Sequence, residues 1–247
     1  IHGANQQSHI HPIPKGAIVR CIFVLDILNG AVVHAVRGER NRYEPIAGFS
    51  RIVSTSDPLG IMQEIRPREV YIADLNLLMG RGDNLAVIKQ ISSLTKTMAD
   101  TGISRACELD NLPASASIVL GTETASLSLI EAAAMRDGII VSIDMKKRKI
   151  LSRDPQLTEK TPLQLLKKLN DLTLQGVILL ELDRVGTSAG LDIRFLEEAR
   201  AAAEHPLILG GGVKGEEDLL ALEEMSFSGV LLATALHNGR IPVALVQ

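Results

Sequence analysis

The sequence predicts a single α/β domain, a (β/α)8 TIM barrel, and three observations point to this fold class. Short apolar runs of β type alternate with longer segments of helical period, which is typical of a parallel sheet wrapped by helices. The chain has 247 residues, and such a barrel typically needs about 250. Short motifs also recur in the same order after roughly 110 to 120 residues, which predicts two similar half-barrels.

The expected strands are nearly continuous apolar runs, as in sheets that are buried on both faces. They lie at residues 20–26, 69–75, 95–100, 117–121, 139–144, 177–183, 206–210 and 229–235. Helices are expected at residues 57–65, 83–91, 123–135, 161–172, 192–204 and 216–225. Several of these helices begin at an Asp or Thr in a capping position. The segment after Thr101 has the weakest helical pattern.

The repeat pairs strand one with strand five, and so on around the barrel. The paired motifs are FVLD with VSID, ADLN with ELDR, MADTGIS with ILGGGVK, and IVLGTETA with VLLATALH. One such match arises easily by chance, but four in register indicate an internal duplication.

The first residues do not follow this pattern. They carry His2, His9 and His11 but no apolar run. We therefore expect residues 1–18 to be a tail, either disordered or appended to the natural chain, and residues 19–247 to form the barrel domain. A histidine metal site in this segment is the alternative.

The composition of the chain argues against nucleic acid and membranes as partners. The chain has 26 basic and 29 acidic side chains, 2% aromatic residues and no Trp, so neither a basic stripe nor stacking platforms are available for nucleic acid. No apolar run approaches the length of a membrane span. Two cysteines without metal-ligand spacing do not make a disulfide framework, which favours a cytoplasmic protein.

Two aspartates stand where a barrel places its reacting groups, at the carboxyl ends of strands. Asp26 follows strand one and Asp144 follows strand five, so the repeat places them on opposite sides of the mouth. Paired carboxyls in a partly desolvated pocket can act as acid and base. A second related pair, Asp74 and Asp183, could serve the site or brace loops.

Three successive glycines, Gly210, Gly211 and Gly212, follow strand seven and precede a helix. Main-chain N–H groups in such a turn, together with a helix N-terminus, can bind phosphate. Ala233 and Thr234, after strand eight, would supply further N–H groups. A plain helix-entry turn is the alternative.

The related element in the first half reads Asp100, Thr101, Gly102. A carboxylate repels phosphate, so one anion site is intact and the other is converted. Gly121 and Thr122, after strand four, could still hold a polar group. A Mg²⁺ site made by Asp100 with Asp74 or Glu123 is a further alternative.

Basic residues gather in the loops after strands one and five, where they could attract an anionic substrate. Arg37 and Lys149 are the candidates for binding it. No Walker loop, HExxH zinc motif or GxSxG elbow is present in the sequence, so neither a metal nor an organic cofactor is expected.

These residues together resemble the histidine-biosynthesis barrel family, which contains ProFAR isomerase and the cyclase subunit of imidazole glycerol phosphate synthase. The resemblance runs from about Arg20 to the end of the chain. The stretches that carry it are LDILNGAVVHAVRGE, ADLN, VSID, ELDRVGT, LGGGVKGEEDL and ATALHNG. It implies a base at Asp26 and an acid at Asp144, acting in an Amadori-type rearrangement of an aminoaldose phosphate to an aminoketose phosphate, with a phosphate bound in each half.

The chain departs from the isomerase pattern at three positions. Leu180 stands where the pattern has Thr, Val185 where it has Asp, and Asp100 where it has a glycine. The combination of MADTGIS, LGTETA, DRVGTSAG and ATALHNG is similar to an isomerase-related branch of methanogens and methylotrophs. That likeness implies a setting in one-carbon cofactor biosynthesis, of the methanopterin or methanofuran kind.

The leading hypothesis is therefore an enzyme that isomerises a phosphorylated, sugar-like small molecule by aspartate acid–base catalysis. Two alternatives stay open: the histidine-pathway ProFAR isomerase itself, and a barrel that binds a phosphometabolite without catalysis. The sequence does not decide the oligomeric state.

Overall fold

The computed structural model describes residues 19–247. The expected tail, residues 1–18 with its three histidines, lies outside the described residues.

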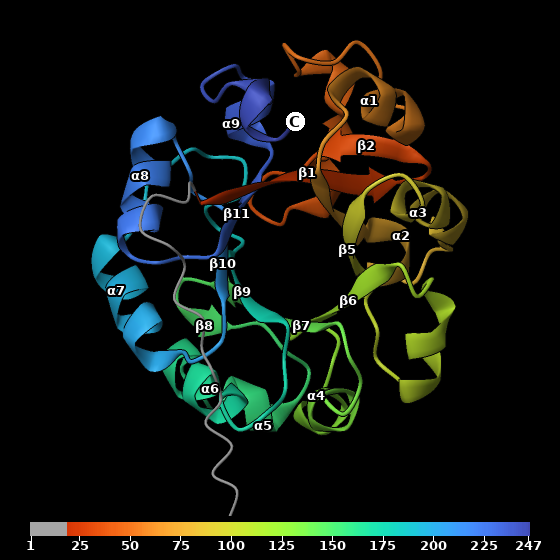
Figure 1. Cartoon of the computed structure of the whole chain (residues 1–247). Helices are drawn as coiled ribbons and strands as arrows, with labels where there is room; N and C mark the ends of the chain where they lie inside the picture. The colour runs from red at the N-terminus through yellow and green to blue at the C-terminus, as the bar shows by residue number, and fades with distance from the viewer. Residues whose placement is uncertain (1–18) are drawn as a thin grey trace, which may run out of the picture.

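Eight parallel strands close into a barrel (Figure 1). Around the ring they are β1 (Arg20–Leu28), β4 (Glu69–Asp74), β5 (Lys96–Asp100), β6 (Ala116–Gly121), β7 (Ile139–Lys146), β9 (Gly176–Glu181), β10 (Leu207–Gly210) and β11 (Gly229–Leu232). The ring closes because β11 pairs with β1 in parallel, with Gly229 opposite Arg20. The predicted (β/α)8 barrel is confirmed, whereas its origin in two similar halves stays a prediction.

Helices surround the strands (Figure 1). They are α1 (Pro58–Ile65), α2 (Leu75–Leu78), α3 (Leu85–Ser92), α4 (Leu127–Ala133), α5 (Pro155–Thr158), α6 (Pro162–Leu169), α7 (Ile193–Ala202), α8 (Glu216–Glu224) and α9 (Thr234–His237). Four short 3-10 turns are η1 (Arg40–Arg42), η2 (Ile46–Gly48), η3 (Ala106–Asn111) and η4 (Val243–Leu245). The weak helical pattern after Thr101 corresponds to η3.

Side-chain caps explain where helices begin. The Asp57 carboxylate accepts a hydrogen bond from Gly60 N at 2.6 Å ahead of α1. At α6, Thr161 and Gln164 form a reciprocal capping box, which satisfies two main-chain donors that a helix start leaves free. Within residues 19–247, every helix is too short or too polar to cross a membrane.

Two strands run further than their apolar pattern indicated. β1 continues past Asp26 because it forms an antiparallel hairpin with β2 (Ala31–His34), which pairs in turn with β3 (Glu44–Pro45). β7 likewise continues past Asp144 and pairs with β8 (Lys149–Ile150). Each hairpin therefore lies at the carboxyl end of its barrel strand.

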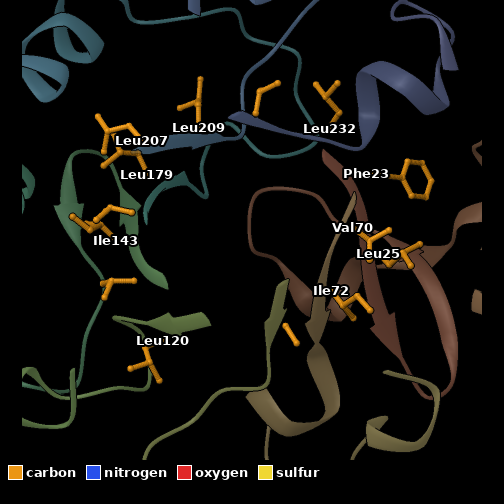
Figure 2. Close-up of a cluster of buried hydrophobic side chains, with 14 of the residues drawn as sticks. Phe23, Leu25, Val70, Ile72, Leu120, Ile143, Leu179, Leu207, Leu209 and Leu232 are labelled. Carbon is orange, nitrogen blue, oxygen red and sulfur yellow. The ribbon is translucent and has the colours of Figure 1, made fainter. Parts of the chain in front are cut away.

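The strands bury both faces, as their composition predicted. Alternate residues point outward to the helices, and Figure 2 shows this layer with Phe23, Leu25, Val70, Ile72, Leu120, Ile143, Leu179, Leu207, Leu209 and Leu232 from strands around the barrel. The intervening residues fill the interior; they include Ile22, Val24, Tyr71, Met98, Val119, Ile140, Ile178 and Ile208. The period of two along each strand therefore decides which residues face the barrel axis.

Candidate active site

The period of two places both predicted aspartates at the mouth of the barrel. Asp26 follows Ile22 and Val24 on the inward face of β1, and Asp144 follows Ile140 on the inward face of β7. Strands β1 and β7 are four places apart in the ring of eight. Both aspartates line one cavity at the carboxyl ends of the strands, so the structure brings together the two carboxyls that the sequence singled out.

Asp144 is held by its neighbours and is 3% exposed. Ser142 Oγ donates to its Oδ1 at 2.7 Å, and Glu123 N donates to its Oδ2 at 3.0 Å. Its own N–H donates to Thr122 Oγ1 at 2.9 Å. Thr122 is fully buried and is not among the residues that line the cavity, so in this structure its hydroxyl holds the main chain at Asp144.

A third carboxyl, Asp100, lies beside Asp144. A Cβ added to Gly121 would be 2.8 Å from Oδ2 of Asp144 and 3.3 Å from Oδ2 of Asp100. Gly121 therefore leaves the space in which the two carboxyls face each other. Tyr71 Oη donates to Asp100 Oδ2 at 3.2 Å, and Gly102 N donates to Asp100 Oδ1 at 3.1 Å.

Burial raises the pKa of all three carboxyls. The pKa of Asp26 rises to about 7 because of burial and the nearby Asp100, against the lowering effect of Arg40. The pKa of Asp144 is raised by burial and then by Asp100, and burial also raises that of Asp100. A group that titrates near neutral pH can both accept and donate protons there.

An ion pair lies at the side of the cavity that the first half forms. Arg40, from η1, makes two hydrogen bonds to the Glu123 carboxylate, at 2.9 and 2.7 Å. Both residues line the cavity together with Tyr43 and Asp100. The first half therefore lines the cavity with carboxylates and one paired guanidinium, whereas the second half lines it with a glycine turn.

The glycine turn lines the opposite side of the cavity. Gly211 and Gly212 have φ of 92° and 88°, which side chains rarely adopt. An added Cβ on Gly211 would be 2.8 Å from the carbonyl oxygen of Glu181. Among the hydrogen bonds formed within residues 19–247, none uses N–H of Gly211 or Gly212 as donor. These N–H groups remain available to an anion.

The helix after this turn, α8, is less suited to binding an anion than the sequence pattern indicated. The first turn of α8 is acidic, with Glu216, Glu217 and Asp218, and Asp218 already accepts a hydrogen bond from Lys214 N at 2.6 Å. The predicted phosphate site therefore depends on the glycine turn rather than on the start of α8, and it stays a prediction. Ala233 and Thr234 directly follow β11 and line the same cavity, and Thr234 Oγ1 is 3.3 Å from His34 Nε2.

Of the remaining predicted binding residues, some line the cavity and others do not. Arg37 is exposed and lines the cavity. Lys149 is exposed on β8 and, like Asp183, is not among the residues that line the cavity, whereas Lys146 is. Asp183 accepts a hydrogen bond from Lys147 N at 3.2 Å. Binding roles for Arg37, Lys149 and Asp183 stay predictions.

Asp74 has a structural role in this fold. Its buried carboxylate accepts hydrogen bonds from the N–H groups of Asn76, Leu77 and Asn84, at 3.1, 3.1 and 2.6 Å. It does not line the cavity that Asp100 lines, so the structure does not bring Asp74 and Asp100 together there as the magnesium alternative requires. No group of three His, Cys, Asp or Glu side chains suited to a metal occurs within the described part of the chain.

Tyr71, which was not among the predicted site residues, faces Asp100 inside the barrel. A signal existed, because a tyrosine in an otherwise apolar strand must find a partner for its hydroxyl group. Arg184 and Ser188, which were not among the predicted site residues either, line the cavity from the loop after β9. Both residues lie in the stretch DRVGTSAG, but only the path of the folded loop brings their side chains to the site.

Comparison with known proteins gives a consistent set of relatives. A family model described as "Histidine biosynthesis protein" matches residues 20–242. An uncharacterized protein of Methanocaldococcus jannaschii is 31% identical over 228 residues, which is 90% of this chain and 94% of that protein. Two relatives named 1-(5-phosphoribosyl)-5-((5-phosphoribosylamino)methylideneamino)imidazole-4-carboxamide isomerase, or ProFAR isomerase, are also similar. The relative from Methanosphaera stadtmanae is 24% identical over 88% of this chain and 93% of its own length. The relative from Thermus thermophilus is 27% identical over 90% of this chain and 96% of its own length.

Proposed function

The chain belongs to the histidine biosynthesis protein family, and from this we propose that it is a cytoplasmic isomerase of the ProFAR isomerase type. The proposed reaction is an Amadori-type rearrangement that converts an aminoaldose phosphate into an aminoketose phosphate. The observation that carries the proposal is that Asp26, Asp144 and the glycine turn line one cavity. They would supply a proton acceptor, a proton donor and a phosphate-binding turn.

The rearrangement moves hydrogen within one molecule and needs no oxidant, reductant or second substrate. Protonation of the ring oxygen opens the sugar and leaves a protonated imine between C1 and nitrogen. Removal of the C2 proton sends the C–H electrons toward nitrogen and gives an enolamine. The enol hydroxyl then loses its proton while C1 gains one, which yields the aminoketose.

We assign the acid to Asp144 and the base to Asp26. The raised pKa of Asp144 keeps a proton available for the ring oxygen, and its hydrogen bonds to Ser142 and Glu123 hold the carboxyl in place. Asp26 has a pKa of about 7, so its basic form is populated at neutral pH. A base and an acid on opposite strands can act on different atoms of one substrate between them.

The variant Asp100→Asn should shift the pH profile of turnover toward lower pH. Asp100 raises the pKa of both Asp26 and Asp144, so a neutral amide in its place lowers both values. Base activity then appears, and acid activity disappears, at lower pH than in the wild type. Measured kcat against pH tests this, and an unchanged profile would show that Asp100 does not tune the pair.

The relatives named as ProFAR isomerases favour the histidine-pathway reaction over a role in one-carbon cofactor biosynthesis. We therefore take ProFAR as the substrate to test. The purified full chain should convert ProFAR to its aminoketose isomer, and its gene should restore growth without histidine to a strain that lacks the isomerase. Failure of both would reject this substrate, and a screen of other aminoaldose phosphates would then decide whether the reaction type survives.

A phosphometabolite-binding barrel without catalysis is the second candidate. It is favoured by the apolar side chains of Leu180 and Val185, which line the cavity at positions where the isomerase pattern has Thr and Asp. Such a protein would be stabilised by its ligand, because binding to the native state alone raises the unfolding temperature, yet would leave the ligand unchanged. Thermal unfolding and mass spectrometry of the same sample separate the two functions.

A further inference from the structure

Ser188 lies in the loop between β9 and α7, and its hydroxyl has no partner. Its Oγ is buried and makes no hydrogen bond, the single such side-chain atom found among residues 19–247. Yet Ser188 lines the same cavity as Gly211 and Gly212. Buried polar groups in native proteins are almost always hydrogen-bonded, so this hydroxyl is free to bind a ligand that enters the cavity.

The backbone of Ser188 is also held in an unfavourable conformation. Its φ is 49°, in the left-handed region where a serine is uncommon. The surrounding loop fixes it there: Thr187 Oγ1 donates to Arg184 O at 2.7 Å, and Gly190 N donates to Gly212 O at 2.8 Å. Strain of this kind persists where the surrounding structure imposes it, and it is frequent at ligand-binding positions.

Arg184 lies beside the glycine turn. Its Cδ would be 3.4 Å from a Cβ added to Gly212. Its Nε pairs with Glu181 Oε2 at 2.9 Å, and its Nη1 donates to Gly190 O at 2.8 Å. Neither bond uses Nη2. Glu181 is also paired with Arg148 at 2.8 Å, so the guanidinium is positioned by a buried carboxylate that is already shared between two cations.

We propose that Ser188 and Arg184 form a side-chain anchor for the phosphate of the substrate. Rotation about χ1 brings the Ser188 hydroxyl to the cavity, where it donates to one phosphate oxygen, and Arg184 donates to the phosphate through Nη2. The N–H groups of Gly211 and Gly212 bind the remaining oxygens. The proposal rests on the proposed function in one respect, that a phosphate monoester binds at the glycine turn.

The test uses the full chain with inorganic phosphate and ribose 5-phosphate as probes, and ribose as the uncharged comparison. Isothermal titration should show that Ser188→Ala binds both phosphates about tenfold more weakly than the wild type, as expected for loss of a hydrogen bond to a charged group. Without ligand, Ser188→Ala should unfold at the same or a higher temperature, because alanine keeps the backbone strain and removes a buried unpaired hydroxyl. Arg184→Lys should also weaken binding.

Two control variants should bind phosphate like the wild type. They are Ser93→Ala, whose exposed hydroxyl bonds Gln90 O, and Arg194→Lys, whose exposed guanidinium pairs with Glu198. Equal phosphate affinity of Ser188→Ala and the wild type would overturn the anchor, as would a wild type that binds neither phosphate probe or binds ribose equally well. Phosphate binding that depends on Ser188, in a protein without isomerase turnover, would reject the proposed function and keep the anchor.

Discussion

Asp26→Asn and Asp144→Asn should each lower kcat for the proposed isomerisation by about 10²- to 10⁴-fold, the usual contribution of a positioned acid or base. Asparagine has nearly the same shape as aspartate but neither accepts nor delivers the required proton. Steady-state turnover of ProFAR by purified variants measures the effect. The matched control is Asp171→Asn, an exposed position outside the cavity, which should turn over like the wild type.

Loss of folding would not explain the result for Asp26→Asn, because this variant should be at least as stable as the wild type at neutral pH. The folded pKa of Asp26 is about 7 against an ordinary value of 3.8, so the folded protein keeps a proton that the unfolded chain releases. Stability from this group is therefore present below about pH 4 and is lost as the pH rises through about 7. Urea unfolding at pH 8 should show Asp26→Asn gaining stability relative to the wild type. Full activity in both aspartate variants would refute the acid–base assignment.

Gly211→Ala should weaken phosphate binding by about 100-fold, equivalent to two hydrogen bonds to a charged group. Alanine is strained at a φ of 92°, and its Cβ would lie 2.8 Å from a main-chain oxygen of Glu181. The turn must move, and with it the N–H groups of Gly211 and Gly212. The same strain should lower the free energy of unfolding by about 1–3 kcal/mol.

A neighbouring glycine provides the control for this variant. Gly215 has extended backbone, and an added Cβ would meet no atom within 4 Å, so Gly215→Ala should leave phosphate binding unchanged and should lack the strain expected of Gly211→Ala. Titration calorimetry with inorganic phosphate and urea unfolding give the two readouts. Wild-type affinity in Gly211→Ala would mean that phosphate does not bind through this turn.

The fold could be predicted because its main determinant is local. Apolar runs of strand length separated by capped helical segments recur along the chain, and each expected strand is present. The strand ends were less predictable, since the continuation of β1 to Leu28 depends on pairing with residues 31–34. An apolar run indicates which residues are buried. A hairpin beyond that run is held by main-chain hydrogen bonds, which polar residues can make as well, so hydrophobicity does not show where the strand ends.

The candidate site could be predicted in part for the same reason. Asp26, Asp144 and the glycine turn follow directly from where strands end. Ser188 could not be predicted in this way, because it lines the cavity only through the path of a loop. The sequence did locate Thr122 near the mouth, but only the structure shows that its hydroxyl binds the main chain of Asp144.

The rim of the barrel joins distant parts of the chain. Arg37 N donates to Val185 O at 3.0 Å, and Gly186 approaches Ala35 O so closely that a Cβ there would be 2.5 Å away. Neither the segment from β1 to β6 nor the segment from β7 to β11 contains a whole rim. Open to water along one side, the carboxyls of either segment would regain the acidity of free aspartic acid. Their capacity to exchange protons at neutral pH is therefore a property of the complete ring, since Asp26 and Asp144 also lie on different segments.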